Sequence, residues 1–478
     1  MNYETVIGLE VHLQLSTNTK AFCACPTKFG QKPNSQTCPV CLGLPGSLPV
    51  LNEQAFLYAI KVALALHCQI QKIIKFDRKN YYYPDLPKNF QISQYDMPLS
   101  FDGFVDIPDE SSSGRKRIRI TRVHLEEDAG KLIHPEGEDY TLVDLNRTGM
   151  PLLEIVTEPD MNSPQEAYDY LTKLKTILEY LKVSDCDMEK GSLRCDANIS
   201  IRPIGEKKLG TKVELKNMNT FKGVRQGLEY EVKRQLSAVK DNEKIVQETR
   251  LWDADKQVTI SMRRKEEATD YRYFPEPDLV PFVVDPSIID SIRNTLPELP
   301  EAKVNRYMKE LGLSEYDSNV LAGRMDLADY FEACAQVYEN KKTIANWVTG
   351  DILAYLNTHG IMASELGLSA NGLASLLKMI DAGALSGKMA KDILTEAIET
   401  KVDPEDIVAK RGLSQISDSE KLEEIIKLVM SKNEKSVNDY KSGKKNALGF
   451  LVGQAMRETK GTANPEMVNK ILKKALGE

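Results

Sequence analysis

A short stretch in the first third of the chain gathers several groups that could do chemistry. From Thr121 to Lys131 it holds one imidazole, three carboxylates and two cations, directly after the strand-like run 117–123. Carboxylates at this density repel one another unless a positive group lies among them. Their oxygens suit Mg²⁺, which proteins hold through one or two carboxylates together with substrate phosphates. A cationic partner or water could take the same place, so a solvated acidic turn remains the alternative.

The N-terminal segment offers two more such groups. Apolar and polar residues alternate from Leu9 to Leu15, which predicts a half-buried strand. Glu10 and His12 fall on its polar face, roughly 6–7 Å apart along the strand. They could share a metal or phosphate site, and the alternative is a polar face in contact with solvent.

A further carboxylate lies in an apolar strand. Glu154 is flanked by leucine, isoleucine and valine residues within the run 151–157. A carboxylate is not buried there without a partner, because moving an unpaired charge out of water is strongly unfavourable. We therefore expect Glu154 to be a metal ligand or a member of an ion pair. Shortly before this strand, Asn146 and Arg147 lie in a predicted turn.

Four cysteines form two chelating pairs. Twelve residues separate the pair Cys23 and Cys25 from the pair Cys38 and Cys41, and both pairs lie on turns rich in proline and glycine. Four thiolates suit tetrahedral Zn²⁺, and four protein ligands leave no open position, so the spacing predicts a structural zinc site. Unliganded thiols or a redox pair are the alternatives. The other four cysteines are isolated, which is typical of small core residues.

Two loops mix charged residues with aromatic rings. The segment 76–94 contains Lys79 and Lys88 among tyrosines and phenylalanines, and the segment 270–279 has the same character. Such loops could stack a base and neutralise phosphate. They could equally be surface loops fixed by their tyrosines.

Length and composition limit the possible functions. The 478 residues predict two to four domains, and eight cysteines in a chain of this length do not describe a disulfide scaffold. There is no long apolar run and no signal-peptide pattern, which predicts a cytoplasmic protein without a membrane span. With a net charge of −7, contact with nucleic acid requires a local basic surface. The sequence has neither a G-x-x-x-x-G-K-[ST] loop nor G-x-G-x-x-G, so any ATP site is non-standard.

The second half of the sequence differs in character from the first. A boundary is expected at Thr295–Pro300, after which helical patterns dominate, and a second near 402–404. From Lys432 to the end there are ten Lys or Arg residues and five Asp or Glu residues, so this end is basic in an acidic protein. A small helical module that touches nucleic acid and a solvated tail both fit this composition.

Taken together, these motifs resemble one protein family. The run 142–155, with its core Asp-x-Asn-Arg-x-Gly-x-Pro-Leu-x-Glu, looks like the signature of the B subunit of the bacterial aspartyl/glutamyl-tRNA amidotransferase, part of the GatCAB complex. The resemblance covers essentially the whole chain. Matching motifs also lie at residues 4–12, 79–85, 124–131, 194–198, 214–217, 271–277 and 449–454.

The resemblance implies a fold. The expected fold class is an α+β N-terminal cradle with a mostly antiparallel sheet, followed by two all-α domains. The cradle would span residues 1–294 and include the four-cysteine zinc site. A helical linker domain would span 295–403, and a small helical tail domain that contacts tRNA would span 404–478.

The resemblance also implies a reaction. The cradle would use ATP to phosphorylate the side-chain carboxylate of misacylated Glu-tRNA(Gln) or Asp-tRNA(Asn). Ammonia from the glutaminase A subunit would then displace phosphate, which makes the complex a ligase with glutamine as amido donor. The C subunit would complete the heterotrimer. No Ser-Lys or Cys-His constellation stands out, so we expect that this chain does not release ammonia from glutamine itself.

Site residues follow from the matched motifs. His12, Glu154 and the pair Glu126 and Glu127 would hold Mg²⁺, with Glu10 on the same strand face as His12. Alternation along a strand places Glu126 and Glu127 on opposite faces, so we expect one of them to be a ligand. The apolar pattern does not decide which one. The candidates for contacts with phosphate or acyl phosphate are Lys79, Lys88 and Arg147.

Two other functions remain open at this point. One is a noncatalytic tRNA-binding scaffold of the same complex, and the presence of the four predicted Mg²⁺ ligands argues against it. The other is the related archaeal subunit specific for Glu-tRNA(Gln), which carries an inserted domain. The sequence has no room for such an insert between Phe274 and Thr295.

Overall fold

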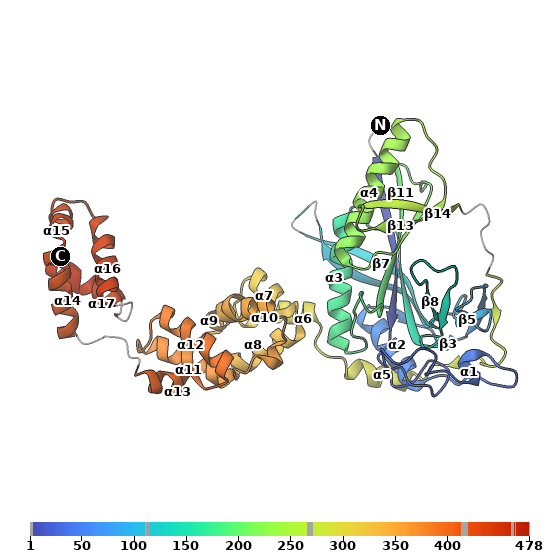
Figure 1. The fold of residues 1–478 in the computed structure, drawn as a ribbon, viewed down its shortest axis with the longest axis horizontal. Helices are drawn as coiled ribbons and strands as arrows, with labels where there is room; N and C mark the ends of the chain where they lie inside the picture. Colours follow the sequence, from blue (N-terminus) through green and yellow to red (C-terminus); the bar gives the residue numbers. More distant parts are fainter. Residues whose placement is uncertain are drawn as a thin grey trace. The chain divides into compact units, whose positions relative to one another are not determined.

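A computed structural model describes residues 3–109, 112, 114–264, 271–412, 419–459, 463 and 465–477 (Figure 1). The chain divides into two compact units, Met1–Pro300 and Glu301–Glu478. The first combines a large sheet with helices, and the second is helical in its described parts. The predicted fold class is therefore confirmed.

Nine strands form the main sheet of the first unit. Their order is β14-β13-β12-β11-β1-β10-β7-β6-β2, and among the described pairs β12–β13 alone is parallel. The prediction of a mostly antiparallel sheet is correct. In the same order the strands span Val258–Arg264, Glu248–Asp253, Val213–Lys216, Leu193–Pro203, Tyr3–Gln14, Pro151–Thr157, Arg115–Glu127, Ser100–Pro108 and Gln69–Ile70.

Helices cover the apolar face of this sheet. Helix α2 (Glu53–Ala65) contacts β7, α3 (Pro164–Leu181) contacts β6, and α4 (Phe221–Lys240) contacts β11 and α3 (Figure 1). The alternation predicted for β1 is present, since Leu9 and Val11 are buried in the core while Glu10 and His12 are only partly covered. The polar side chains of β1 are thus left on the face without these helices.

An irregularity in β7 decides which of its side chains share a face. The register between β7 and β10 shifts at Thr121, which has no partner in β10. A bulge of this kind reverses the simple alternation for the residues that follow it. Ile120 before the bulge and Val123 after it are both buried, although they are three residues apart. Glu127 therefore lies on the face of Val123, and Glu126 lies on the opposite face.

Three small sheets complete the first unit. Strand β5 contacts β7, so the sheet β15-β4-β5 lies beside the end of β7 that carries Glu126 and Glu127. Two short helices are α1 (Pro39–Leu42) and α5 (Pro286–Asn294). The strands of the small sheets are β15 (Phe274–Pro275), β4 (Asp77–Asn80) and β5 (Phe90–Ser93); β16 (Phe282–Val283) and β3 (Ile73–Ile74); and β8 (Lys131–Ile133) and β9 (Leu142–Asp144).

The helices of the second unit pack around two separate apolar cores. The first core lies among α6 (Pro300–Glu310), α7 (Glu315–Ala322), α8 (Met325–Val337), α9 (Lys341–Trp347), the π-helical turn Val348–Ile352, α10 (Leu353–His359), the 3₁₀ turn Ala363–Glu365, α11 (Ala370–Asp381), α12 (Gly387–Thr400) and α13 (Pro404–Arg411). The second lies among α14 (Ser419–Lys432), α15 (Glu434–Lys441), α16 (Ala447–Glu458) and α17 (Pro465–Leu476).

The two apolar cores indicate where the helical region divides into domains. Ile407 of α13 belongs to the first core of the second unit, and α13 contacts α11 and α12. A boundary after α13 would keep this core intact, whereas a boundary between residues 403 and 404 would cut through it. We propose that the linker domain extends through Arg411.

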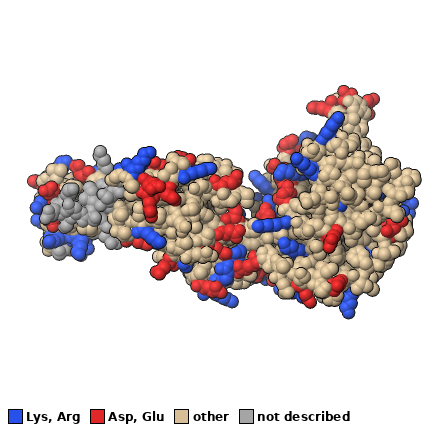
Figure 2. All heavy atoms as spheres, turned by 90° about the horizontal axis from the view of Figure 1, so that it is seen from below, with Lys and Arg blue, Asp and Glu red and all other residues tan. Residues whose placement is uncertain are grey.

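The surface of the described residues is mixed in charge. Figure 2 shows basic and acidic side chains interspersed over the face that it displays. No helix within the described ranges has the length and apolar character needed to cross a membrane.

Candidate functional site

Four neighbouring strands carry a row of polar side chains across the main sheet. Arg194 of β11 pairs with His12 of β1, and His12 pairs with Glu154 of β10. Glu154 pairs in turn with His124 of β7. Directly paired residues point to the same face of a sheet, and Glu126 joins them two residues after His124. The sheet register therefore gathers side chains that are far apart in the sequence.

The carboxylates and imidazoles of this row lie within a few ångströms of one another. His12 Nε2 is 3.6 Å from Glu154 Oε2 and 4.0 Å from Glu126 Oε1. His124 Nε2 is 3.2 Å from Glu154 Oε2 and 3.6 Å from Glu126 Oε2. One potential ligand atom from each of His12, Glu126 and Glu154 lies within 4.8 Å of the others. We call these three residues the carboxylate–histidine cluster.

Burial makes the charges of this cluster strongly interdependent. Burial alone would raise the pKa of Glu126, but Lys79 and His124 outweigh it and hold the pKa below its usual value. The pKa of Glu154 lies well below its usual value because His124 and His12 likewise overcome its burial. Burial opposes protonation of His124, yet the two carboxylates raise its pKa to about 9. Two anionic oxygens and an imidazole nitrogen in one buried spot could hold a divalent cation.

Lys79 faces the cluster from the small sheet. It is the third residue of β4, and the carboxylates of Glu126 and Glu154 raise its pKa against the effect of burial. The neighbouring strand β5 contributes Ser93, whose hydroxyl donates to Glu126 Oε2 at 2.9 Å. The small sheet thus brings one cation and one hydrogen-bond donor to the carboxylates.

Glu10 lies on the same face but outside the cluster. It lies two residues before His12 on β1, and it pairs with Val156 in β10 and Asp196 in β11. Its carboxylate accepts a hydrogen bond from Asn198 Nδ2 at 2.8 Å. Asn198 belongs to one of the matched sequence motifs, and its amide fixes the direction of Glu10.

Two of the predicted site residues, Glu127 and Lys88, contact each other outside the carboxylate–histidine cluster. Glu127 accepts a hydrogen bond from the backbone N–H of Ile92 at 2.9 Å and forms an ion pair with Lys88. Both side chains are nearly buried, and they line a cavity of about 210 Å³ that also touches Cys41. Of the two adjacent glutamates, one of which was expected to be a metal ligand, Glu126 lies with His12 and Glu127 lies with Lys88 on the other side of β7.

Arg147 fixes a turn near the row. Its Nε donates to the backbone carbonyl of Ala129 at 3.0 Å, and its Nη2 donates to that of Gly130 at 2.6 Å. Its guanidinium is also 3.6 Å from Asp128, which accepts a hydrogen bond from Arg194 Nη2 at 2.7 Å. Arg147 therefore holds the chain after β7 in place and is linked to the row through Asp128.

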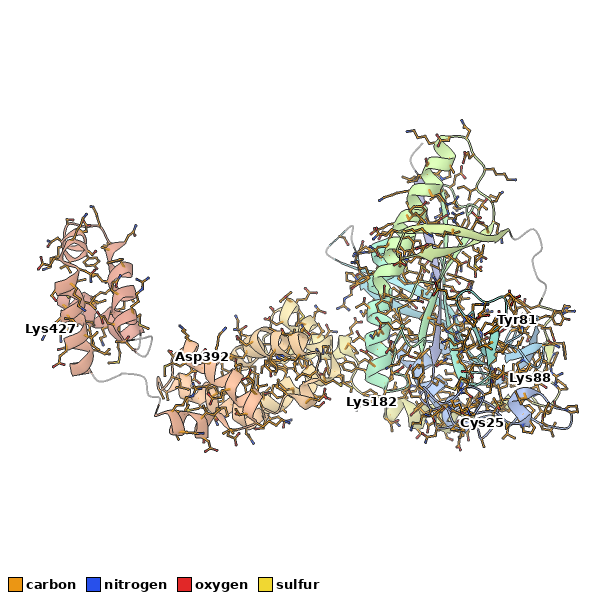
Figure 3. The ribbon with its side chains drawn as sticks, viewed as in Figure 1. Cys25, Tyr81, Lys88, Lys182, Asp392 and Lys427 are labelled. Carbon is orange, nitrogen blue, oxygen red and sulfur yellow. The ribbon has the colours of Figure 1, made fainter. Side chains whose placement is uncertain are left out.

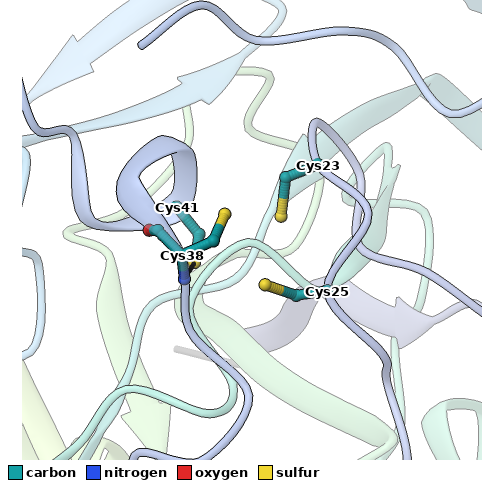
Figure 4. A group of neighbouring side chains, drawn as sticks. All are labelled: Cys23, Cys25, Cys38 and Cys41. Atoms are coloured by element: carbon teal, nitrogen blue, oxygen red, sulfur yellow. Dashed lines mark hydrogen bonds between the residues drawn. The ribbon is translucent and has the colours of Figure 1, made fainter.

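The four cysteines meet as the spacing predicts. One sulfur from each of Cys23, Cys25, Cys38 and Cys41 lies within 4.8 Å of the others. Figure 4 shows Cys23 and Cys25 on one loop, with their sulfurs directed towards the turn that carries the other pair. The backbone N–H of Cys38 donates to Cys41 Sγ at 3.2 Å, and this hydrogen bond stabilises a negative charge on the sulfur. The donor set and its convergence fit a tetrahedral metal ion such as Zn²⁺.

A buried lysine stands beside these sulfurs. Lys20 is fully buried, and its ammonium donates to the backbone carbonyl of Gln36 at 2.7 Å and to Cys41 Sγ at 3.7 Å. Hydrogen bonding from Cys23 and the nearby charge of Lys20 lower the pKa of Cys41 to about 4. The surroundings thus favour thiolate at Cys41, which is the form that binds metal.

Three residues in or beside the row were missed by reasoning from the sequence. His124 lies in the stretch 121–131 and Asp128 follows the glutamate pair, while Arg194 opens a matched motif. The signal for His124 was its spacing of two residues from Glu126, which places both on one strand face. The roles of Asp128 and Arg194 depend on strand register, which local spacing does not reveal.

Comparisons with known proteins agree with the resemblance. A family model described as "GatB/GatE catalytic domain" matches residues 5–290, and one described as "GatB domain" matches residues 329–476. The B subunit of the aspartyl/glutamyl-tRNA(Asn/Gln) amidotransferase of Carboxydothermus hydrogenoformans is 54% identical over 100% of this chain and 99% of its own length. The B subunit of the same name from Caldanaerobacter subterraneus is 53% identical over 100% of both chains. That of Brevibacillus brevis is 52% identical over 99% of both.

Proposed function

Because the chain belongs to the B-subunit family of the aspartyl/glutamyl-tRNA(Asn/Gln) amidotransferases, we propose that it activates a tRNA-linked carboxylate with ATP. The γ-phosphoryl group moves to the side-chain carboxylate of Glu-tRNA(Gln) and/or Asp-tRNA(Asn), and ADP leaves. Ammonia from a partner glutaminase then attacks the carbonyl carbon and releases phosphate. The products are Gln-tRNA(Gln) and Asn-tRNA(Asn), so the complex is an ATP-dependent ligase that forms a carbon–nitrogen bond with glutamine as amido donor.

The observation that carries this proposal is the carboxylate–histidine cluster with Lys79 beside it. Two anions approach each other when a carboxylate attacks a triphosphate, so the site must supply positive charge in a fixed geometry. His12, Glu126 and Glu154 would hold Mg²⁺, which supplies this charge to the phosphate oxygens when bound. Lys79 would place an ammonium against the transferred phosphoryl group. It is well suited because the same carboxylates that face it keep it protonated.

His124 and Arg194 act as positioning residues in this proposal. His124 Nε2 faces both cluster carboxylates, so it limits how far they can rotate. Arg194 pairs with Asp128, which is also held by Gln14 Nε2 at 2.8 Å. These contacts keep the floor of the site rigid while substrates bind.

The four cysteines would hold a structural Zn²⁺. A site with four thiolates has no open position for a substrate. Its net negative charge would be reduced by the buried ammonium of Lys20. The ion would fix the loops that carry Phe22 and Gly43, both of which line the cavity next to Lys88 and Glu127.

The proposal includes partners. We infer a heterotrimer with the glutaminase A subunit and a C subunit in the cytoplasm, with misacylated tRNA as substrate. The helices α14–α17 are candidates for tRNA contact, since Lys473 and Lys474 lie in the last turn of α17.

The test is ATP cleavage by the reconstituted three-subunit complex in the presence of Glu-tRNA(Gln). We expect His12→Ala to reduce the tRNA-dependent cleavage at least ~100-fold, because it removes a ligand from the proposed metal site. His134→Ala is the matched control, since His134 is exposed and outside the cluster. Cleavage that is unchanged in His12→Ala would overturn the proposal.

A further inference from the structure

Two aromatic loops that are far apart in the sequence meet beside the small sheet. Tyr81 and Tyr83 follow β4, Tyr95 follows β5, and Tyr271 and Tyr273 precede β15. Figure 3 shows Tyr81 in the part of the first unit that also holds Lys88. Their rings form a continuous series, which we call the tyrosine row. The distances between ring centroids are 5.9 Å for Tyr83–Tyr81, 5.9 Å for Tyr81–Tyr271, 6.1 Å for Tyr271–Tyr273 and 4.3 Å for Tyr273–Tyr95.

The packing of the first unit does not explain this row. None of its five rings belongs to the apolar core formed by the described residues of that unit. Tyr83 is 50% exposed, Tyr95 is 52% exposed and Tyr271 is 38% exposed. Tyr95 and Tyr273 are stacked nearly parallel, with an interplanar angle of 12°, so their ring faces are already oriented alike. Exposed aromatic faces held in a fixed direction are suited to stacking against a flat ligand.

The row is connected to the carboxylate–histidine cluster through short stretches of chain. Tyr95 lies two residues after Ser93, whose hydroxyl is bonded to Glu126. Lys79 Nζ lies 5.2 Å from the ring centre of Tyr271 and 6.0 Å from that of Tyr81, and it faces the cluster carboxylates. A ligand stacked on the row would therefore lie close to the groups that we propose to carry the phosphoryl transfer.

We propose that the tyrosine row stacks the unpaired 3′-terminal adenosine of the aminoacyl-tRNA. This inference rests on the proposed function and names how its substrate is held. The reacting carboxylate ends the side chain of an amino acid whose α-carboxyl group is esterified to the terminal ribose, so the terminal base must lie near the cluster when the carboxylate reaches it. Aromatic side chains are the usual platform for unpaired bases, because every base has a π-face.

Two cations lie beside the tyrosines of these loops. Arg272 donates to the hydroxyl of Tyr82 at 2.7 Å and lies 5.4 Å from its ring centre, at the edge of the row. Lys79 lies at its middle. Single-stranded nucleic acid is commonly bound by stacking rings combined with such charges. The adenine of ATP presents the same flat face, so the experiment must separate the two sources of adenosine.

The experiment measures binding of deacylated tRNA to the three-subunit complex without ATP, with intact tRNA and with tRNA that lacks the terminal adenosine. For the unaltered complex we expect intact tRNA to bind about 5- to 150-fold more tightly, as stacking of one base provides. Tyr95→Ala and Tyr83→Ala should each reduce this ratio at least threefold. Tyr95→Phe, which keeps the ring, and Tyr140→Ala, which removes a 50% exposed tyrosine outside the row, should keep it.

An unchanged ratio in both alanine variants would overturn the proposal. If the same variants also have a raised KM for ATP, the row is assigned to the nucleotide instead. Because this binding ratio is measured without ATP, it does not depend on phosphoryl transfer. A failure of the proposed function in the His12→Ala test can therefore be told apart from a failure of this inference.

Discussion

The two adjacent glutamates at the end of β7 should respond very differently to the same substitution. Glu126 faces His12 and His124, whereas Glu127 faces Lys88 on the other side of the strand. Glu126→Gln removes one negative charge from the cluster and keeps the shape of the side chain. Glu127→Gln makes the same chemical change and leaves the cluster intact, so it is the matched control.

The expected loss of divalent-cation affinity in Glu126→Gln follows from the distances within the cluster. Two unit charges 4 Å apart interact by about 4 kcal/mol at an effective dielectric constant of 20. Glu126 Oε1 is 4.0 Å from His12 Nε2, so a divalent cation held between these atoms lies closer than 4.0 Å to Glu126, and about 4 kcal/mol is a lower bound on its attraction to that carboxylate. The amide oxygen of glutamine keeps part of the attraction. We expect a net loss of about 2–3 kcal/mol, which corresponds to about 30- to 150-fold weaker binding of the divalent cation.

The assay is titration of the complex with Mn²⁺ as a paramagnetic substitute for Mg²⁺, monitored by electron paramagnetic resonance. Glu126→Gln should weaken binding by this factor. Glu127→Gln should change it less than threefold, although it lowers stability by leaving Lys88 without its carboxylate. Equal weakening in the two variants would show that the faces of β7 are assigned incorrectly.

Three further predictions concern stability and metal content. Elemental analysis should find one zinc per chain. Cys38→Ser should abolish zinc binding and lower the free energy of unfolding by on the order of 3 kcal/mol or more. Cys68→Ser, which changes a cysteine outside the four, should keep the metal. Lys88→Met should destabilise the protein by about 3–5 kcal/mol because Glu127 is left buried without a cation, and adding Glu127→Gln should restore most of this loss in urea unfolding. Burial lowers the pKa of Lys173 from 10.5 to about 8, so Lys173→Met should bring a pH-dependent gain in stability of about 1–2 kcal/mol after allowance for partial exposure, against which stands the lost hydrogen bond from its ammonium to the backbone carbonyl of Asp106 at 2.5 Å. The gain is largest below about pH 8, where Lys173 is charged in the folded protein in spite of its burial. It disappears as the pH rises towards 10.5. A gain that does not change with pH would contradict this prediction.

Elements with strong local patterns were predictable from the sequence. The alternation from Leu9 to Leu15 placed Glu10 and His12 on the polar face of β1, where the structure has them. The local sequence Ser-Pro-Gln-Glu at 163–166 is typical of a helix start, and Ser163 caps α3 by accepting a hydrogen bond from the backbone N–H of Glu166 at 3.0 Å. The cysteine spacing was also sufficient, because chelating pairs separated by a short loop can meet without information from the rest of the fold.

The choice between Glu126 and Glu127 was not predictable. Ile118 and Ile120 share the alternation phase of Glu126, whereas Val123 shares that of Glu127, so the apolar pattern supported both faces. The bulge at Thr121 reconciles the two phases, and it becomes visible only from the pairing of β7 with β10. A pairing between strands remote in sequence depends on the whole sheet, and local spacing does not encode it.

The position of Lys88 relative to the cluster was not predictable for a related reason. A lysine in an aromatic loop is suited to a phosphate as well as to a buried carboxylate, and the sequence shows only the charge. In the structure Lys88 lies 5.0 Å from the ring centre of Phe90 and pairs with Glu127. Its partner comes from the opposite face of β7, so the position of Lys88 depends on the phase of that strand, which the sequence leaves undetermined.

The most direct test of the proposed reaction follows the oxygen atoms of the substrate. If the side-chain carboxylate is phosphorylated and ammonia then displaces phosphate, one carboxylate oxygen leaves with the phosphate. The measurement is mass spectrometry of the phosphate released when the complex amidates Glu-tRNA(Gln) labelled with ¹⁸O in its side-chain carboxylate. We expect one ¹⁸O atom in each phosphate released per Gln-tRNA(Gln) formed. Phosphate that carries no ¹⁸O from the substrate would contradict phosphorylation of the carboxylate.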